Sequence, residues 1–128
     1  MIPGVIFEDL PKENYHEDER RTLTSVFNGD VPGFPCAEQV KFAHMKETRE
    51  LGRHFHCYPE LFYVLSGKAT FTLQPPDIGN GYTFELVPGK RLLIPPRVFH
   101  SALVEAGTIL CGLTQMKYIS PKVNDHHT

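Results

Sequence analysis

Residues 52–67 read GRHFHCYPELFYVLSG, and this stretch holds the chain's most distinctive side-chain chemistry. In an extended chain successive side chains point to opposite faces, so His54, His56 and Glu60 point the same way provided that the bend near Pro59 keeps them in phase. Two imidazoles and a carboxylate then converge, which is a donor set that Fe(II), Mn(II), Ni(II) and Zn(II) accept. The stretch therefore predicts a metal site on a β-strand.

A second stretch, residues 89–100, reads GKRLLIPPRVFH. A glycine turn begins an apolar strand, two prolines end it, and His100 begins the strand that follows. His100 then adds a third imidazole to the two in the first stretch. We expect the following side chains to gather at one site: His54, His56, Glu60 and His100.

The rest of the chain alternates short polar and apolar patterns with turns. Ten glycines and 11 prolines punctuate segments that are typical of β-strands. We expect strands at residues 22–27, 38–45, 54–65, 69–74, 82–86, 91–95, 98–105 and 108–116. About eight strands in this length predict an all-β sandwich or barrel. The one helical candidate is residues 12–20, which is too polar for a core helix.

Composition places the chain among ordinary globular proteins. Of its 128 residues, 41% are hydrophobic and 22% are charged, and the formal net charge is −2. These values fit one domain with a buried core. The densest run of charge, residues 17–21, changes sign within itself, so we expect no nucleic-acid partner.

Location and redox state follow from what the sequence lacks. The N-terminal residues have neither the basic start nor the apolar run of a secretory signal, and no apolar stretch is long enough to span a bilayer. Cys36, Cys57 and Cys111 form an odd set without CxxC spacing, which favours neither a disulfide framework nor a zinc knuckle. We expect a cytoplasmic protein with reduced thiols and no membrane partner.

Together the two stretches match the motifs HxHxxxExxxxxxG and GxxxxxPxxxxH, and the sequence resembles a small single-domain cupin. The resemblance implies an all-β double-stranded β-helix, which is a jelly-roll barrel, as a single domain over residues 1–128. Its first motif lies at 52–67 and its second at 89–104. The resemblance also implies one divalent metal ion (Zn, Mn, Fe or Ni) with the ligands His54, His56, Glu60 and His100.

The second motif departs from the cupin pattern at two positions. Arg97 stands where a glycine is usual, and because arginine tolerates positive φ poorly we expect a different local turn. Val104 stands where an asparagine is usual, which predicts a more apolar pocket. Neither change affects the four expected ligands.

The flanks weakly resemble the sugar-nucleotide cupins, on residues 18–23, 40–42 and 118–125. This resemblance implies an isomerase or epimerase that moves a proton next to the carbonyl of a 4-keto-6-deoxyhexose linked to a nucleoside diphosphate. In the ketoisomerase branch the catalytic histidines are those at the positions of His54 and His56, and that branch need not use a metal. A histidine that binds a metal through its lone pair cannot also be a free base, so the two roles compete at the same residues.

Three classes of function remain open on the sequence. The expected one is a metal-binding isomerase or epimerase acting on a small sugar or sugar-nucleotide substrate. The alternatives are a metal-dependent dioxygenase on a small organic substrate and a non-catalytic small-molecule-binding cupin.

Basic and aromatic side chains offer further contacts to such a substrate. Candidates for binding a diphosphate or carboxylate are Lys41, Arg53, Arg91 and Arg97, and candidates for acid or stacking roles are Tyr58, Tyr63 and Tyr82. We also expect a homodimer, in which apolar residues 5–7 cover the sheet edge of a partner.

Overall fold

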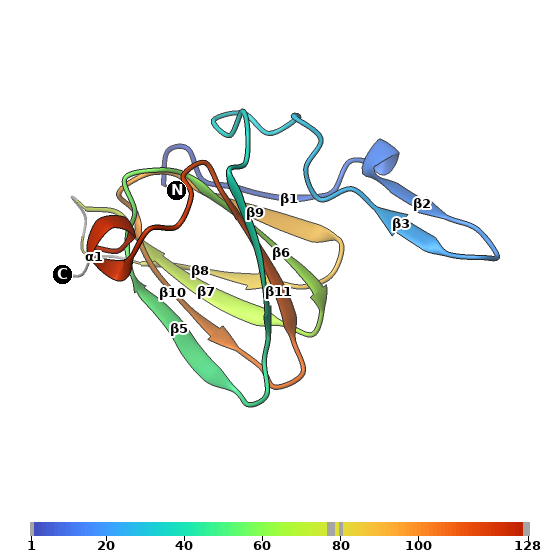
Figure 1. Ribbon diagram of the computed structural model, residues 1–128. Helices are drawn as coiled ribbons and strands as arrows, with labels where there is room; N and C mark the ends of the chain where they lie inside the picture. Colours follow the sequence, from blue (N-terminus) through green and yellow to red (C-terminus); the bar gives the residue numbers. More distant parts are fainter. Residues whose placement is uncertain (1, 77–78, 80, 127–128) are drawn as a thin grey trace.

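The computed structural model describes residues 2–76, 79 and 81–126, and these residues form two antiparallel sheets that face each other (Figure 1). The five-stranded sheet has the order β1 (Ile6–Asp9), β9 (Lys90–Ile94), β6 (Glu60–Ser66), β11 (Ile109–Thr114) and β4 (Gln39–His44). The four-stranded sheet has the order β5 (Arg49–His54), β10 (Phe99–Val104), β7 (Ala69–Gln74) and β8 (Tyr82–Leu86). The predicted all-β jelly-roll barrel is confirmed.

Apolar side chains fill the space between the two sheets. On β7, for example, Ala69, Phe71 and Leu73 are buried while Thr72 and Gln74 are exposed, which is the alternation of a strand with one face in the core. β6 instead carries an almost continuous apolar run. A second cluster packs on the outer face of the five-stranded sheet, where Phe34 meets Leu61 and Leu93, so β6 is buried on both faces.

The N-terminal region supplies one strand of the barrel and a hairpin outside it. β1 pairs with β9 of the same chain, with Ile6 opposite Leu93, and the contact of residues 5–7 with a partner stays a prediction. The helical candidate at residues 12–20 is not a helix over most of its length. A short 3-10 helix, η1 (Lys12–Asn14), leads into β2 (Tyr15–Glu17), which pairs with β3 (Thr22–Thr24) in a hairpin that projects from the barrel (Figure 1).

The strand expected at 54–65 is divided in two. β5 ends at His54, the chain turns through residues 55–59, and β6 begins at Glu60. His54 and Glu60 therefore lie on two strands with a loop between them rather than on one straight strand, and their side chains converge across that loop.

A β-bulge in β5 turns His54 into the barrel. Ser101 of β10 pairs with Gly52 and His100 pairs with His54, so Arg53 is the extra residue. Gly52 and Arg53 have φ values of 91° and 66°. In regular alternation Leu51 and His54 would point to opposite faces, whereas in this structure both line the same cavity.

Arg97 corrects the expectation of a different turn in the second motif. Its φ is 68°, so the backbone keeps the left-handed conformation that a glycine adopts easily, with arginine in the glycine's place. The one α-helix in the described part of the chain is α1 (Pro121–Asn124). Among the described residues, no helix is long and apolar enough to cross a membrane.

Candidate functional site

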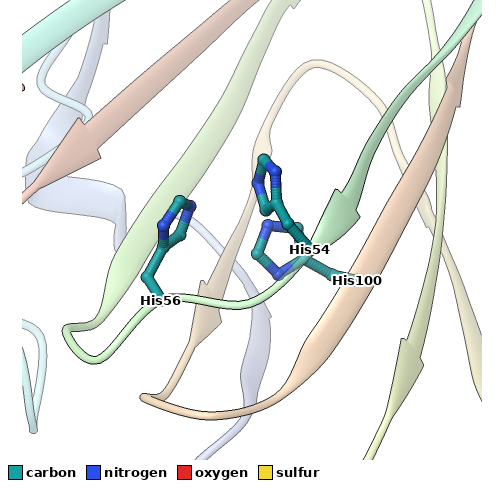
Figure 2. A group of neighbouring side chains, drawn as sticks. All are labelled: His54, His56 and His100. Carbon is teal, nitrogen blue, oxygen red and sulfur yellow. The ribbon is translucent and has the colours of Figure 1, made fainter. Parts of the chain in front are cut away.

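Three histidines from two strands and a loop lie side by side inside the barrel (Figure 2). His54 ends β5, His56 lies in the loop that follows, and His100 is in β10. One nitrogen of each ring lies within 4.8 Å of one nitrogen of the others. The side chains of His56 and His100 are buried, and that of His54 is 19% exposed.

Glu60 joins this cluster through its contacts with two of the histidines. Its side chain is 2% exposed, and its Oε1 lies 3.3 Å from Nε2 of His56 and 3.6 Å from Nε2 of His100. Its Oε2 lies 3.6 Å from the ammonium of Lys41. The structure thus brings the four predicted residues to one place, with the Glu60 carboxylate between two imidazoles and a lysine.

Backbone carbonyls orient the two buried imidazoles. Nδ1 of His56 donates to the carbonyl of Asn124 at 2.6 Å, and Nδ1 of His100 donates to the carbonyl of Val98 at 3.1 Å. Because a carbonyl only accepts, Nδ1 carries the hydrogen in both rings and Nε2 faces Glu60. This arrangement, with Nδ1–H on a backbone carbonyl, is typical of histidines that ligate metals through Nε2.

Two buried polar atoms indicate that the cluster fits a cation. Nε2 of His100 and Oε1 of Glu60 have no well-formed hydrogen bond within the described residues, although both are fully buried. Buried polar atoms are rarely left so unless water, an ion or a ligand serves them. Two imidazole nitrogens and a carboxylate oxygen are suitable donors for a divalent transition metal.

The protonation preferences of the four groups differ. Burial, together with the charges of His100 and His56, lowers the pKa of His54 to about 4, so this imidazole is neutral at pH 7. Burial also lowers the pKa of His100. Burial alone would lower the pKa of His56, but the contact with Glu60 outweighs burial and the pKa of His56 is raised. Burial alone would raise the pKa of Glu60, but His56 and neighbouring cations outweigh burial and the pKa of Glu60 is lowered.

The C-terminal segment supplies parts of the site that sequence reasoning missed. The carboxylate of Asp125 lies 3.7 Å from Nδ1 of His56 and 3.9 Å from Nδ1 of His54. Asn124 donates to the hydroxyl of Tyr58 at 3.0 Å, and His126 pairs with Phe55 through two backbone hydrogen bonds. A serine followed by proline at 120–121 signals the start of a short helix, but nothing in the sequence shows where that helix docks.

A cavity of about 150 Å³ opens beside the cluster. Its polar wall is formed by His54, Glu60, His100 and Lys41, and the rest is mainly apolar, with Leu51, Phe62, Phe71, Ala102 and Leu110 among the lining side chains. Val104, expected to make the pocket more apolar, lies instead in the core cluster at the opposite end of β10 from His100. The cavity places the imidazole of His54 next to space for a small, partly apolar ligand.

Of the four basic residues considered for anion binding, one is structural. Arg91 is buried, and its guanidinium donates to Glu8, Asp30 and the carbonyl of Val26. Lys41 faces the cavity. Arg53 and Arg97 are exposed, and they are the two non-glycine residues of the described chain with positive φ; Arg53 pairs with Glu50 at 3.0 Å.

The three tyrosines take different places. Tyr58 stacks on His56, with ring centroids 4.7 Å apart, and so belongs to the site. Tyr63 packs in the outer cluster and its hydroxyl accepts from the backbone of Gly89. Tyr82 lies on β8 and is 36% exposed.

Comparison with known proteins finds likeness in structure but not in sequence. No family model matches the chain, and no curated protein matches it. A doubly substituted 3,4-ketoisomerase from Thermoanaerobacterium thermosaccharolyticum, in complex with TDP, has a TM-score of 0.81 and 21% identity, covering 100% of this chain and 90% of that one. A TDP-quinovose 3,4-ketoisomerase from Campylobacter jejuni has a TM-score of 0.83 and 17% identity, covering 99% and 95%.

An epimerase has the same architecture. The dTDP-4-dehydrorhamnose 3,5-epimerase from Sulfolobus tokodaii has a TM-score of 0.80 and 19% identity, covering 96% of this chain and 76% of that one. A variant of the Thermoanaerobacterium enzyme has been solved with TDP-4-keto-6-deoxyglucose bound, at a TM-score of 0.77, 21% identity and coverage of 94% and 86%. At these identities the likeness concerns the fold, and it confirms the cupin fold predicted from the two motifs.

Proposed function

We propose that this cupin-fold chain is a keto-sugar isomerase or epimerase, which moves a proton next to the carbonyl of a sugar linked to a nucleoside diphosphate, with His54 as the base. The observation that carries the proposal is a neutral imidazole opening onto a cavity that also holds a carboxylate and an ammonium. The neighbours in structure, which are named as sugar-nucleotide isomerases and epimerases, support the substrate class.

The reaction needs a base whose lone pair is free at neutral pH. The pKa of His54 is about 4, so its imidazole is almost entirely neutral at pH 7 and accepts a proton without first losing one. In a 3,4-ketoisomerisation the proton leaves C3 of a 4-keto sugar, the electrons form an enediolate over C3 and C4, and a proton returns at C4. The hydroxyl proton passes from O3 to O4, so the product is the 3-keto isomer of the same composition.

Asp125 completes the base. Once His54 has taken the proton it is an imidazolium, and the carboxylate of Asp125, 3.9 Å from Nδ1, stabilises that charge. His56 and His100 do not act in this step, because each holds its Nδ1 hydrogen on a backbone carbonyl and turns Nε2 toward Glu60.

We propose in addition that Nε2 of His56, Nε2 of His100 and Oε1 of Glu60 hold one divalent metal ion. The sequence predicts His54 as a fourth ligand, but a base needs its lone pair free, so in this proposal His54 faces the substrate instead. A divalent ion at this position supplies a Lewis acid, which stabilises negative charge on a nearby carbonyl oxygen.

The metal-dependent dioxygenase is the second candidate function. It is favoured by the same donor set, three imidazoles and one carboxylate, when His54 is a ligand rather than a base. In that case the protein loaded with Fe(II) consumes O₂ with a small organic substrate and does not exchange protons on keto sugars.

Proton exchange on a defined substrate tests the proposal. Incubation with TDP-4-keto-6-deoxyglucose in D₂O is expected to place deuterium on the carbon beside the ketone, and nuclear magnetic resonance then separates isomerisation (a 3-keto product) from epimerisation. His54→Asn is expected to reduce the exchange rate by at least about 100-fold. The matched control is His44→Asn on β4, an exposed histidine outside the site, which is expected to keep the full rate.

Two results would overturn the proposal. One is the absence of exchange in the wild-type protein with any keto sugar of this class. The other is a His54→Asn variant that exchanges at the rate of the wild type.

A further inference from the structure

We infer that Lys41 is a catalytic residue of the proposed reaction, and that its ammonium contacts the substrate oxygen on which negative charge develops. The inference rests on the proposed function and adds to it the group that stabilises the enediolate. It comes from the path of the Lys41 side chain through the sheet.

Lys41 reaches the site by crossing a neighbouring strand. It lies on β4, an edge strand of the five-stranded sheet, where lysine side chains usually extend into solvent. Lys41 pairs with Gly112 of β11, and Gly112 pairs in turn with Phe62 of β6. The Lys41 ammonium nevertheless lies 3.6 Å from Oε2 of Glu60, which is also on β6. The side chain therefore lies across β11 and ends at the cavity.

Gly112 makes that path possible. A Cβ at this position would lie 3.2 Å from Cε of Lys41 and 3.3 Å from a ring carbon of Phe62, both tighter than ordinary contacts. Other glycines of the chain, such as Gly52 and Gly67, have positive φ, but Gly112 does not. The backbone conformation of Gly112 does not require glycine, so the lack of a side chain at this position leaves room for the side chain of Lys41.

The charges of the cavity wall indicate which side chain stabilises negative charge on the substrate. Lys41 is the single Lys or Arg among the described residues that line the cavity, where the neutral His54 and the buried His100 also lie. An enolate or enediolate oxygen needs a positive charge or a strong donor beside it. Lys41 meets this need, because its ammonium has three hydrogens and its contact with Glu60, at 3.6 Å, is longer than a hydrogen bond.

The burial of the pair also fits this role. Glu60 is 2% exposed while Lys41 is 51% exposed, so the lysine lies at the open side of the carboxylate rather than being enclosed with it.

A Lys41→Met variant, which removes the positive charge and keeps a side chain of similar length, tests the inference. In Lys41→Met the exchange rate with TDP-4-keto-6-deoxyglucose in D₂O is expected to fall about 100-fold, mainly in kcat, because the lost interaction belongs to the transition state. The control Lys46→Met removes an exposed lysine from the loop after β4 and is expected to keep the wild-type rate.

Chemical rescue separates catalysis from mere positioning of Glu60. Lys41→Ala leaves space along β11, and added ethylamine is expected to restore part of its exchange rate in a saturable way. No rescue is expected for His54→Asn. Ethylamine that fails to raise the rate of Lys41→Ala would overturn the catalytic role.

A double-mutant cycle tests the path over Gly112. Gly112→Ala is expected to lower the exchange rate by displacing Lys41, and the same change in the Lys41→Met background is expected to cause no further loss. Circular dichroism and thermal unfolding confirm that each variant is folded. Additive losses in the cycle would overturn the inference.

The two proposals fail in different ways. A wild-type protein without exchange overturns the function and this inference together. A Lys41→Met variant as active as the wild type overturns the inference alone, since the proposed function then proceeds without the lysine.

Discussion

Nδ1 of His56 lies 2.6 Å from the carbonyl oxygen of Asn124, so the C-terminal segment is hydrogen-bonded directly to the histidine cluster. Asn124 is itself held firmly: its side-chain oxygen accepts from the backbone of Ile119 and Ser120, and its amide donates to Tyr58. A carbonyl only accepts, so this contact keeps the hydrogen of His56 on Nδ1 and directs Nε2 toward Glu60.

Metal content is the first test of that orientation. Protein purified without an affinity tag is expected to contain about one divalent metal per chain by elemental analysis. His56→Ala is expected to remove most of it, because the variant lacks one of the two Nε2 donors beside Glu60. His44→Ala, outside the site, is expected to retain it. Stoichiometric metal in a His54→Ala/His56→Ala double variant would show that the ion is bound elsewhere.

Arg97→Gly is expected to stabilise the protein slightly. The left-handed conformation at φ 68° costs arginine roughly 1–2 kcal/mol, part of which is offset by the greater entropy that glycine loses on folding. We expect a net gain of about 0.5 kcal/mol in the free energy of unfolding, measured with urea. Arg49→Gly, at an exposed position of β5, is expected to lose a similar amount, and a gain there would contradict the explanation.

Gly67→Ala is expected to be severely destabilising. A Cβ there would lie 2.2 Å from Oγ1 and 2.7 Å from Cα of Thr108, which is fully buried, and the backbone has a φ of 92°. We expect a loss of more than about 3 kcal/mol in the free energy of unfolding. Gly107→Ala is the control: its φ is also positive but no atom lies within 4 Å, so about 1 kcal/mol is expected. Equal losses would mean that backbone strain, not the contact with Thr108, is responsible.

Arg91 predicts a pH dependence of stability. Hydrogen bonds from Arg91 hold the pKa of the Asp30 carboxyl below its ordinary value of 3.8. The resulting stabilisation is complete above that value and is lost as the pH falls through the lower, folded-state pKa. Arg91→Met is expected to lose about 3 kcal/mol at pH 7, the low end for a broken buried ion pair because Asp30 and Glu8 are partly exposed.

The difference between wild type and Arg91→Met is expected to shrink below pH 4. Urea unfolding of both proteins between pH 7 and pH 2.5 measures it. A difference that stays constant over this range would show that Arg91 contributes through packing rather than through its charge.

A homodimer is the last expectation to test. Sedimentation at micromolar concentration is expected to give twice the chain mass of 14.5 kDa. The open edge of β4 carries Val40 and Phe42, which are 57% and 62% exposed, and such apolar edges are typical of interfaces. Val40→Lys is expected to give monomers, whereas Leu103→Lys on the other sheet is expected to leave the dimer intact. A wild-type monomer at high concentration would reject the expectation.

The sequence predicted the barrel well because its signals are local. β7 and β8 occupy the expected residues. The turn expected at Gly67 is present, but it does not close a hairpin, because β6 and β7 on either side of it belong to different sheets. The two motifs also identified His54, His56, Glu60 and His100 as neighbours. Residues of metal-binding type at the spacing of a known family indicate which side chains converge from different strands, and alternation along a single strand does not show this. The helical candidate at 12–20 forms a short 3-10 helix and a strand instead, because polar alternation in so short a segment suits a hairpin equally well.

Other parts of the site depend on contacts between distant segments. Asp125 lies in the flank at 118–125, but nothing in that flank indicates a site residue, and its place beside His54 follows from the docking of Asn124 near Tyr58. Lys41 reads as a surface lysine until Gly112 is seen to clear its path. Side chains of this kind are visible only when the register of neighbouring strands is known.

The bulge at Arg53 makes the site depend on parity. Leu51 and His54 are three positions apart, which regular alternation places on opposite faces, and the bulge absorbs the extra residue so that both side chains face the interior. Position 53 therefore matters because it adds one residue to β5, and not because of its side chain. If Arg53 were paired in a regular ladder, the imidazole would turn outward although every functional residue would still be present. Deletion of codon 53 would instead remove the extra residue and leave the histidine two positions from Leu51, on the inward face, so this strand tolerates a change of length at the bulge that it would not tolerate elsewhere.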